Sequence, residues 1–154
     1  ALNIIQSGGF KSAMVNAGGK IAIGEAPPGR EGWRIGIAVP EEKEELMPHL
    51  LLLKNTSVAT SGDIYQHLDI NGKRYSHIID PKTGLGITWQ RNVTVIAKDG
   101  TISDWLATAC SVLSEKKSFQ LIKKFPGAAL LISEMKDDEL IQKRSSNFKD
   151  YLEN

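Results

Sequence analysis

The segment Ser76–Gly84 combines a histidine with an aspartate, two residue types that suit proton transfer. A histidine such as His77 is a residue type that can act as a general base. Asp80 stands in an Asp-Pro turn, where its carboxylate either orients the histidine or shapes the turn. A histidine at the end of a strand is also commonly a structural residue, and we interpret His49 and His67 as structural or solvent-facing.

A carboxylate and a hydroxyl recur four residues apart in the segment Ser103–Thr108. In a helix this spacing places Asp104 and Thr108 on one face. Hard oxygen donors of this kind suit Mg²⁺, which takes few protein ligands and completes its shell with water and phosphate. The alternative is that Asp104 merely complements the dipole in the first turn of the helix.

Two glycine-containing segments complete the set. In Val15–Gly19, the pair Gly18-Gly19 permits a tight turn and lets a ligand approach the backbone, although a plain turn between helix and strand explains it too. In Ala59–Asp63, a hydroxyl pair followed by Gly and Asp either binds phosphate or ends a strand in a capped turn. Neither segment is a P-loop or a dinucleotide fingerprint.

Strands precede a pair of helices, which predicts an α+β fold with helices packed on a mainly antiparallel sheet. Asn71-Gly72 favours a type I′ hairpin turn between its flanking strands. Ser103 is expected to cap the first helix of the pair. The predicted strands are 13–15, 20–23, 33–39, 64–70, 73–78, 92–98 and 128–132, and the predicted helices are 104–113, 115–125 and the tail of one that ends at Gly8. No element is assigned within 41–55.

The composition of the chain excludes several classes of protein. The chain has 154 residues and a formal charge of +1, which argues against a nucleic-acid surface. One cysteine, Cys110, excludes a disulfide framework and a cysteine-rich zinc site. No apolar run is long enough to span a membrane, and the first residues do not resemble a signal peptide.

The four segments occur in an order that resembles the FAD:protein FMN transferases of the ApbE family. The similarity runs from Val15 to Ile132, and its most specific parts are His77–Gly84 and the pair Asp104 and Thr108. The resemblance implies an ApbE-like fold of which residues 1–154 form the C-terminal portion.

The resemblance also implies a reaction. Mg²⁺ would bind the pyrophosphate of FAD, a threonine hydroxyl of a target flavoprotein would attack the FMN-side phosphorus, and AMP would leave. Asp104 and Thr108 match the metal ligands of the family, and His77 matches a histidine suspected of deprotonating the hydroxyl.

The cofactor-binding residues implied by the resemblance are Gly18, Gly19, Ile79, Asp80 and Thr83. The stretch Thr60–Gly62 matches a motif that supports the site. The family further implies an extracytoplasmic lipoprotein anchored at a membrane, although Cys110 lies in a predicted helix and cannot carry the lipid.

Two departures keep other hypotheses open. Lys20 follows the glycine pair where the family often has a small, polar or acidic residue. The chain also lacks upstream segments that complete the site in the family, including one whose carbonyl reaches the metal. The alternatives are therefore an FAD pyrophosphatase with water as nucleophile, a non-catalytic FAD-binding fragment, and an α+β interaction module.

Overall fold

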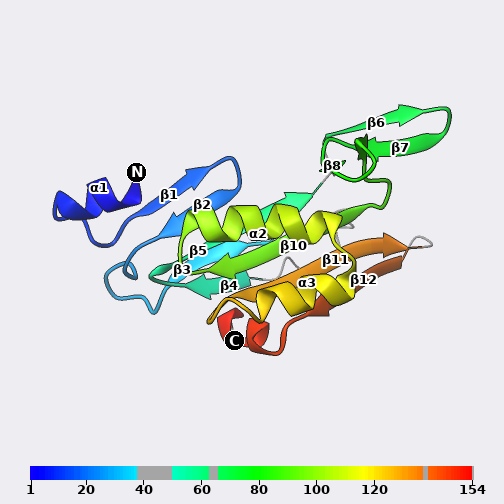
Figure 1. The fold of residues 1–154 in the computed structure, drawn as a ribbon. Coiled ribbons are helices and arrows are strands. Elements are labelled where there is room, and N and C mark those ends of the chain that lie inside the picture. The colour runs from blue at the N-terminus through cyan, green and yellow to red at the C-terminus, as the bar shows by residue number, and fades with distance from the viewer. Residues whose placement is uncertain (38–49, 63–65, 137–138, 154) are drawn as a thin grey trace.

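A six-stranded antiparallel sheet organises the chain (Figure 1). This computed structural model describes residues 1–37, 50–62, 66–136 and 139–153. His49 and Asp63, together with parts of two predicted strands, therefore lie outside the described residues. The spatial order of the sheet is β1 (Met14–Ala17), β2 (Lys20–Ile23), β5 (Thr56–Gly62), β10 (Arg91–Ala97), β11 (Ala129–Lys136) and β12 (Glu139–Arg144).

Both faces of this sheet are covered. The helices α2 (Gly100–Val112) and α3 (Glu115–Ile122) pack on one face. The opposite face carries the two-stranded sheet of β3 (Trp33–Gly36) and β4 (Leu50–Leu53), with the 3₁₀ helix η1 (Ser146–Tyr151). The predicted α+β class with a mainly antiparallel sheet is confirmed.

Alternation along the central strands supplies both cores. Every residue of β10 is buried. Val93 and Val95 belong to the cluster beneath α2, whereas Ile96 belongs to the cluster on the opposite face. In β11, Leu130 and Leu131 divide in the same way. A strand buried on both faces needs apolar residues at successive positions, which explains the apolar runs at 95–97 in β10 and 129–132 in β11.

Two turns confirm specific predictions. Asn71 and Gly72 join β6 (His67–Ile70) to β7 (Lys73–Ser76) with φ values of 51° and 73°, as a type I′ turn requires. At the N-terminus, α1 (Leu2–Ser7) ends where Gly9 takes a φ of 95° and the Phe10 N–H donates to the Ile5 carbonyl. This Schellman pattern satisfies carbonyls that the end of a helix leaves free.

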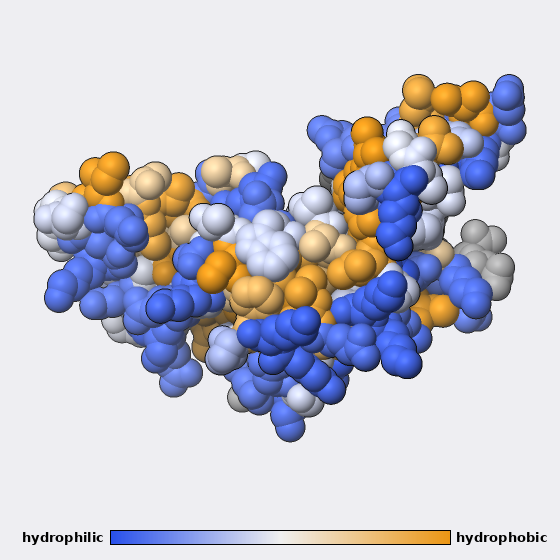
Figure 2. All heavy atoms as spheres, in the orientation of Figure 1, coloured by the Kyte–Doolittle hydropathy of each residue, from blue (hydrophilic) through white to orange (hydrophobic). Residues whose placement is uncertain are grey.

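The β6–β7 hairpin and α1 stand away from the body of the molecule (Figure 1). Both carry apolar surface (Figure 2): Leu68 and Ile70 are exposed on the hairpin, and Ile4 is exposed on α1. After β7 the chain forms the short pair β8 (Ile79–Asp80) and β9 (Leu85–Gly86), then enters β10. The segment that carries His77 thus lies between the hairpin and the sheet.

The prediction that Ser103 caps the helix is wrong. α2 begins at Gly100, and the Asp99 carboxylate caps it by accepting the Ile102 N–H at 3.0 Å. An aspartate is a better cap than a buried serine inside the helix, and Asp104 consequently falls in the second turn. Ser103 is instead fully buried and hydrogen-bonds the Ser57 hydroxyl of β5 at 3.1 Å.

Several boundaries also differ from the predictions. β3 ends at Gly36 within the described residues, α3 ends at Ile122, and β11 extends to Lys136. The run of leucines at 50–53, which received no assignment, is β4 and is largely buried. β12 and η1 were not predicted: β12 has no buried residue and is held by pairing with β11, and the chain just after η1 bridges β4 at Leu152.

The C-terminal end of α2 is fixed to the sheet by two long side chains. The Arg91 guanidinium donates to the Leu113 carbonyl at 3.0 Å and to the Glu134 carboxylate at 2.7 Å. The Trp89 indole N–H donates to the Ser111 carbonyl at 3.1 Å. These donors satisfy carbonyls that have no partner within the helix, and they tie α2 to β10 and β11.

Replacing Arg91 with Met should lower the free energy of unfolding by roughly 1–3 kcal/mol, because Glu134 and the Leu113 carbonyl lose a largely buried partner. Urea unfolding measures the change. The matched control is Arg34→Met: the Arg34 side chain is 54% exposed, and its ion pair with Glu153 should contribute no more than about 1 kcal/mol. Equal losses in the two variants would contradict the anchoring role.

Candidate functional site

The central feature of the candidate site is the exposed side of α2. Asp104 and Thr108 lie one turn apart on it, as the sequence predicts. The Thr108 hydroxyl donates to the Asp104 backbone carbonyl at 3.2 Å, which fixes the hydroxyl oxygen near the preceding turn. Its lone pairs and both carboxylate oxygens therefore remain able to accept a cation or a donor.

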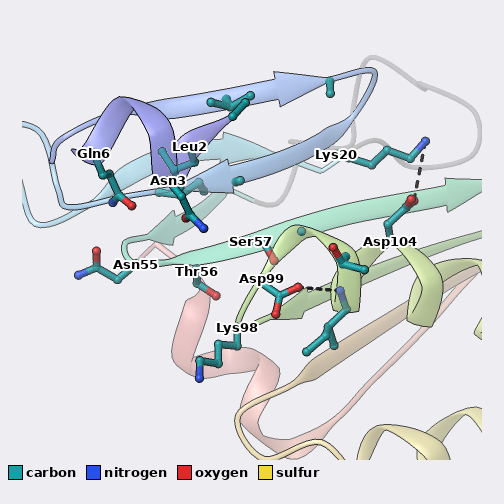
Figure 3. Close-up of a pocket in the computed structure, with 18 residues that line it drawn as sticks. Leu2, Asn3, Gln6, Lys20, Asn55, Thr56, Ser57, Lys98, Asp99 and Asp104 are labelled. Atoms are coloured by element: carbon teal, nitrogen blue, oxygen red, sulfur yellow. Dashed lines mark hydrogen bonds and ion pairs between the residues drawn. The ribbon is translucent and has the colours of Figure 1, made fainter. Parts of the chain in front are cut away.

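Three pockets adjoin these two side chains. The first, of about 870 Å³, lies between α1, β2 and the start of α2 and includes Asp104 (Figure 3). The second, of about 660 Å³, is mostly apolar and includes both Asp104 and Thr108. The third, of about 330 Å³, includes Thr108 and His77. Asp104 and Thr108 thus stand where the three pockets meet.

The structure brings His77 into the third pocket and fixes its ring. Its Nδ1 lies 3.1 Å from the Gln66 carbonyl, which also accepts the His77 backbone N–H. A carbonyl can only accept, so in the neutral imidazole Nδ1 carries the proton and Nε2 is left as the acceptor. An exposed Nε2 is the tautomer that a general base requires. His77 and Thr108 of α2 line this pocket together.

The polar segments predicted at the site line the same third pocket. Its walls come from the β1–β2 turn, the end of β5, the chain around His77, and α2. They are formed by Gly18, Lys20, Thr60, Ser61, Gly62, Gln66, His77, Ile78 and Thr108. Gly62 packs so closely on the buried Asn92 side chain that a Cβ built on it would overlap Asn92 Oδ1. This close approach explains the glycine at the end of β5.

The glycine pair forms the turn of the β1–β2 hairpin. Gly18 and Gly19 adopt φ values of 61° and 84°, and the Gly19 N–H donates to Asn16 Oδ1 at 3.0 Å. Nothing lies within 4 Å of a Cβ built on either glycine. The backbone conformation therefore requires glycine here, and the space beside the turn stays open.

Ile79 is exposed at the mouth of the second pocket. Pro81, the α2 residues Trp105 and Val112, and Leu113 directly after the helix also line this pocket, and apolar surface is visible around the C-terminal half of α2 (Figure 2). A pocket with one apolar side and the Asp104–Thr108 pair at its edge suits a flat ring that bears a charged group.

Asp80 and Thr83 shape the turn between β8 and β9. Asp80 Oδ1 accepts the Lys82 N–H at 2.9 Å, and the Asp80 carbonyl accepts the Thr83 and Gly84 N–H groups. The Thr83 hydroxyl accepts the Leu85 N–H at 3.3 Å. Of the two roles open for Asp80, the structure shows turn formation, because the carboxylate contacts the backbone of its own loop.

Lys20 makes an ion pair with Asp104. Its Nζ lies 3.8 Å from Asp104 Oδ1, and the two side chains are each about half exposed. Figure 3 shows the ammonium reaching from the start of β2 across to α2. Lys20 lines both the first and the third pocket.

The oxygen donors of Asp104 and Thr108 fit a hard divalent cation that takes its other ligands from water and a bound ligand. Within the described ranges, no group of three or more His, Cys, Asp or Glu residues could hold a metal ion. A carboxylate and a hydroxyl on one helix face are too few for zinc but suit Mg²⁺, which retains waters and binds phosphates. The residues present therefore fit Mg²⁺ beside a phosphorylated ligand.

Two residues that shape the candidate site, Gln66 and Asp99, were not predicted from the sequence. Gln66 acts through its backbone carbonyl, for which no side-chain pattern exists. Asp99 caps α2, and the signal was present: an aspartate directly before a glycine and a threonine at the start of the helix. The sequence identifies Lys20 only as a departure from the family pattern. Its contact with Asp104 depends on the packing of the β1–β2 hairpin against α2.

The fold and the site define a class: an antiparallel α+β protein whose sheet-packed helix presents a two-residue oxygen site between three pockets. The ApbE family model matches residues 1–132, and the chain belongs to this family.

Two curated relatives carry the name FAD:protein FMN transferase. The protein of Vibrio cholerae is 33% identical over 149 residues, and the match covers 96% of this chain and 44% of the Vibrio protein. The protein of Haemophilus influenzae is 36% identical over 143 residues, and the match covers 91% of this chain and 41% of the Haemophilus protein. The crystal structure of the ApbE protein from Thermotoga maritima superposes with a TM-score of 0.83 at 33% identity, covering 99% of this chain and 49% of its own. The chain thus spans less than half the length of the relatives it matches.

Proposed function

We propose that the protein takes part in Mg²⁺-dependent transfer of FMN from FAD to a threonine hydroxyl of a target flavoprotein, with release of AMP. The observation that carries the proposal is the convergence of His77, Asp104 and Thr108 on adjoining pockets. The names of the relatives support flavin transfer as the reaction class.

Asp104 and Thr108 would hold the metal, with the pyrophosphate of FAD and water supplying the other ligands. The chemistry that Mg²⁺ supplies when bound is neutralisation of phosphate charge and alignment for in-line displacement. The apolar second pocket, with Ile79 and Trp105, would take a ring system of the dinucleotide. The open backbone around Gly18 lets a polar part of the ligand approach the β1–β2 turn.

His77 would take the proton. Its Nε2 accepts the hydrogen of the threonine hydroxyl while the threonine oxygen forms a bond to the FMN-side phosphorus. The bond from that phosphorus to the bridging oxygen breaks, and AMP leaves with the electron pair. The Gln66 carbonyl holds Nδ1–H throughout and stabilises the imidazolium that forms.

A second candidate reaction is hydrolysis of FAD to FMN and AMP. The observation that favours it is the exposure of His77, since water reaches Nε2 as readily as a protein hydroxyl does. A non-catalytic FAD-binding role is the third possibility, because this chain covers less than half the length of its relatives.

Asp104→Asn should reduce Mg²⁺-dependent AMP release from FAD on the order of 100-fold or more, because loss of the carboxylate charge removes the principal anionic ligand. Chromatographic quantification of AMP, with and without acceptor protein, measures this and separates transfer from hydrolysis. Asp99→Asn is the control: it removes a carboxylate from the first pocket but preserves the helix cap. Undiminished release by Asp104→Asn would refute the metal site, and FAD binding without AMP release by the wild type would favour the non-catalytic role.

His77→Ala should slow FMN transfer by roughly 10²–10⁴-fold while changing FAD affinity much less, because the imidazole acts on the attacking hydroxyl. Single-turnover transfer gives the rate, and flavin fluorescence gives the dissociation constant. His67→Ala, on the neighbouring hairpin strand, should leave both values unchanged. Equal transfer rates for His77→Ala and the wild type would remove the general-base role.

We also propose that the protein works outside the cytoplasm at a membrane, as the resemblance implies. No helix in the described part of the chain is long and apolar enough to cross a bilayer. Cys110 is buried in α2, and burial raises the pKa of its thiol to about 11, so it is a core residue rather than a lipid attachment point. Fractionation of the source cells tests the proposal, and recovery only in the cytosol would contradict it.

A further inference from the structure

We propose that Lys20 is a built-in counter-cation that competes with the metal for Asp104 and so sets the metal affinity of the site. This inference rests on the proposed function, because it concerns the same carboxylate. Its basis is the Lys20–Asp104 ion pair between the β1–β2 hairpin and α2 (Figure 3).

The sheet register puts the Lys20 side chain on the face that α2 covers. Lys20 pairs directly with Ala59 of β5, whose side chain lies in the core beneath α2. Directly opposed residues of an antiparallel pair project to the same face. The Lys20 side chain therefore reaches the helix because of its strand position, and the neighbouring glycine turn fixes where β2 begins.

The geometry permits competition without blocking the carboxylate. At 3.8 Å the Lys20 ammonium is too far from Oδ1 for a hydrogen bond, so the interaction is one between charges. The carboxylate oxygens stay accessible, and a cation bound to them would lie close to the ammonium. Their repulsion must be relieved by screening or by movement of the flexible lysine stem, which costs metal affinity.

Lys20 can move without disturbing the fold. Its side chain is 49% exposed, and the stem lies beside the first and the third pocket. Exposed ion pairs contribute up to about 1 kcal/mol, so removing this charge should strengthen metal binding by roughly two- to fivefold. The effect should shrink as salt is added, because the two groups are partly solvated.

The test is a titration of the full chain with Mn²⁺, a paramagnetic substitute for Mg²⁺, in the absence of flavin, with free Mn²⁺ measured by electron paramagnetic resonance. Lys20→Gln should bind Mn²⁺ about two- to fivefold more tightly than the wild type, and Lys20→Arg should match the wild type. Lys98→Gln is the control for general charge loss, because Lys98 lines the first pocket but points away from Asp104 in Figure 3. It should change the affinity less than Lys20→Gln does.

The outcomes separate the inference from the proposed function. If Asp104→Asn abolishes Mn²⁺ binding and Lys20→Gln binds no more tightly than the wild type, the competition is wrong and the metal site stands. If Asp104→Asn leaves Mn²⁺ binding unchanged, the metal site is wrong and the inference falls with it. If neither the wild type nor Lys20→Gln binds Mn²⁺ without flavin, Lys20 does not set the affinity of the protein ligands and the inference is wrong, whereas a metal site completed by the pyrophosphate stands. An equal gain in Lys98→Gln would show a general charge effect and overturn the inference.

Discussion

The close packing of α2 across β5 and β10 is the constraint on which the rest of the structure depends. Small residues make it possible: Ala59 and Ala97 on the strands face Ser103, Ala107 and Cys110 on the helix. Short side chains let the helix backbone approach the sheet, and the hydrogen bond between the hydroxyls of Ser57 and Ser103 satisfies two polar groups at the contact. Because this face is fixed, the opposite face of α2 presents Asp104 and Thr108 to the outside.

The sheet then decides what surrounds that outer face. β2 lies next to β5 and brings the turn of its hairpin, with Gly18 and Lys20, alongside α2. β10 begins just after the β8–β9 segment, so His77 reaches the same pocket as that turn, and Ile79 reaches the second pocket beside the helix. Residues separated by up to about 90 positions in the chain thus meet around one helical turn. No local interaction could have brought them together, since each belongs to a different element.

The charges around Asp104 say as much about a ligand as the residue types do. A carboxylate on an exposed helix face would be a ready cation ligand, yet here it stands 3.8 Å from an ammonium. The pocket therefore presents both signs of charge within one ligand's reach: a carboxylate for a metal and an ammonium beside it. The proposed ligand, FAD, bears two phosphates, and a bound metal together with this ammonium would meet their charge without a large excess of basic residues in the chain.

The sequence by itself determined the period-two and apolar-run strands, the Asn71-Gly72 turn, the spacing of Asp104 and Thr108, and the family, because local chemistry and spacing fix these. It misplaced the start of α2, because Ser103 has a side chain that can cap a helix, and only its burial within α2 and the cap formed by Asp99 exclude that role. It left β12 and η1 unassigned, because β12 is held by pairing along β11 and η1 by packing of Phe148 into the core on the opposite face of the sheet. The tertiary structure alone decided the His77 tautomer through the Gln66 carbonyl and the approach of Lys20 to Asp104. Both depend on contacts between elements, which a linear pattern of residue types does not encode.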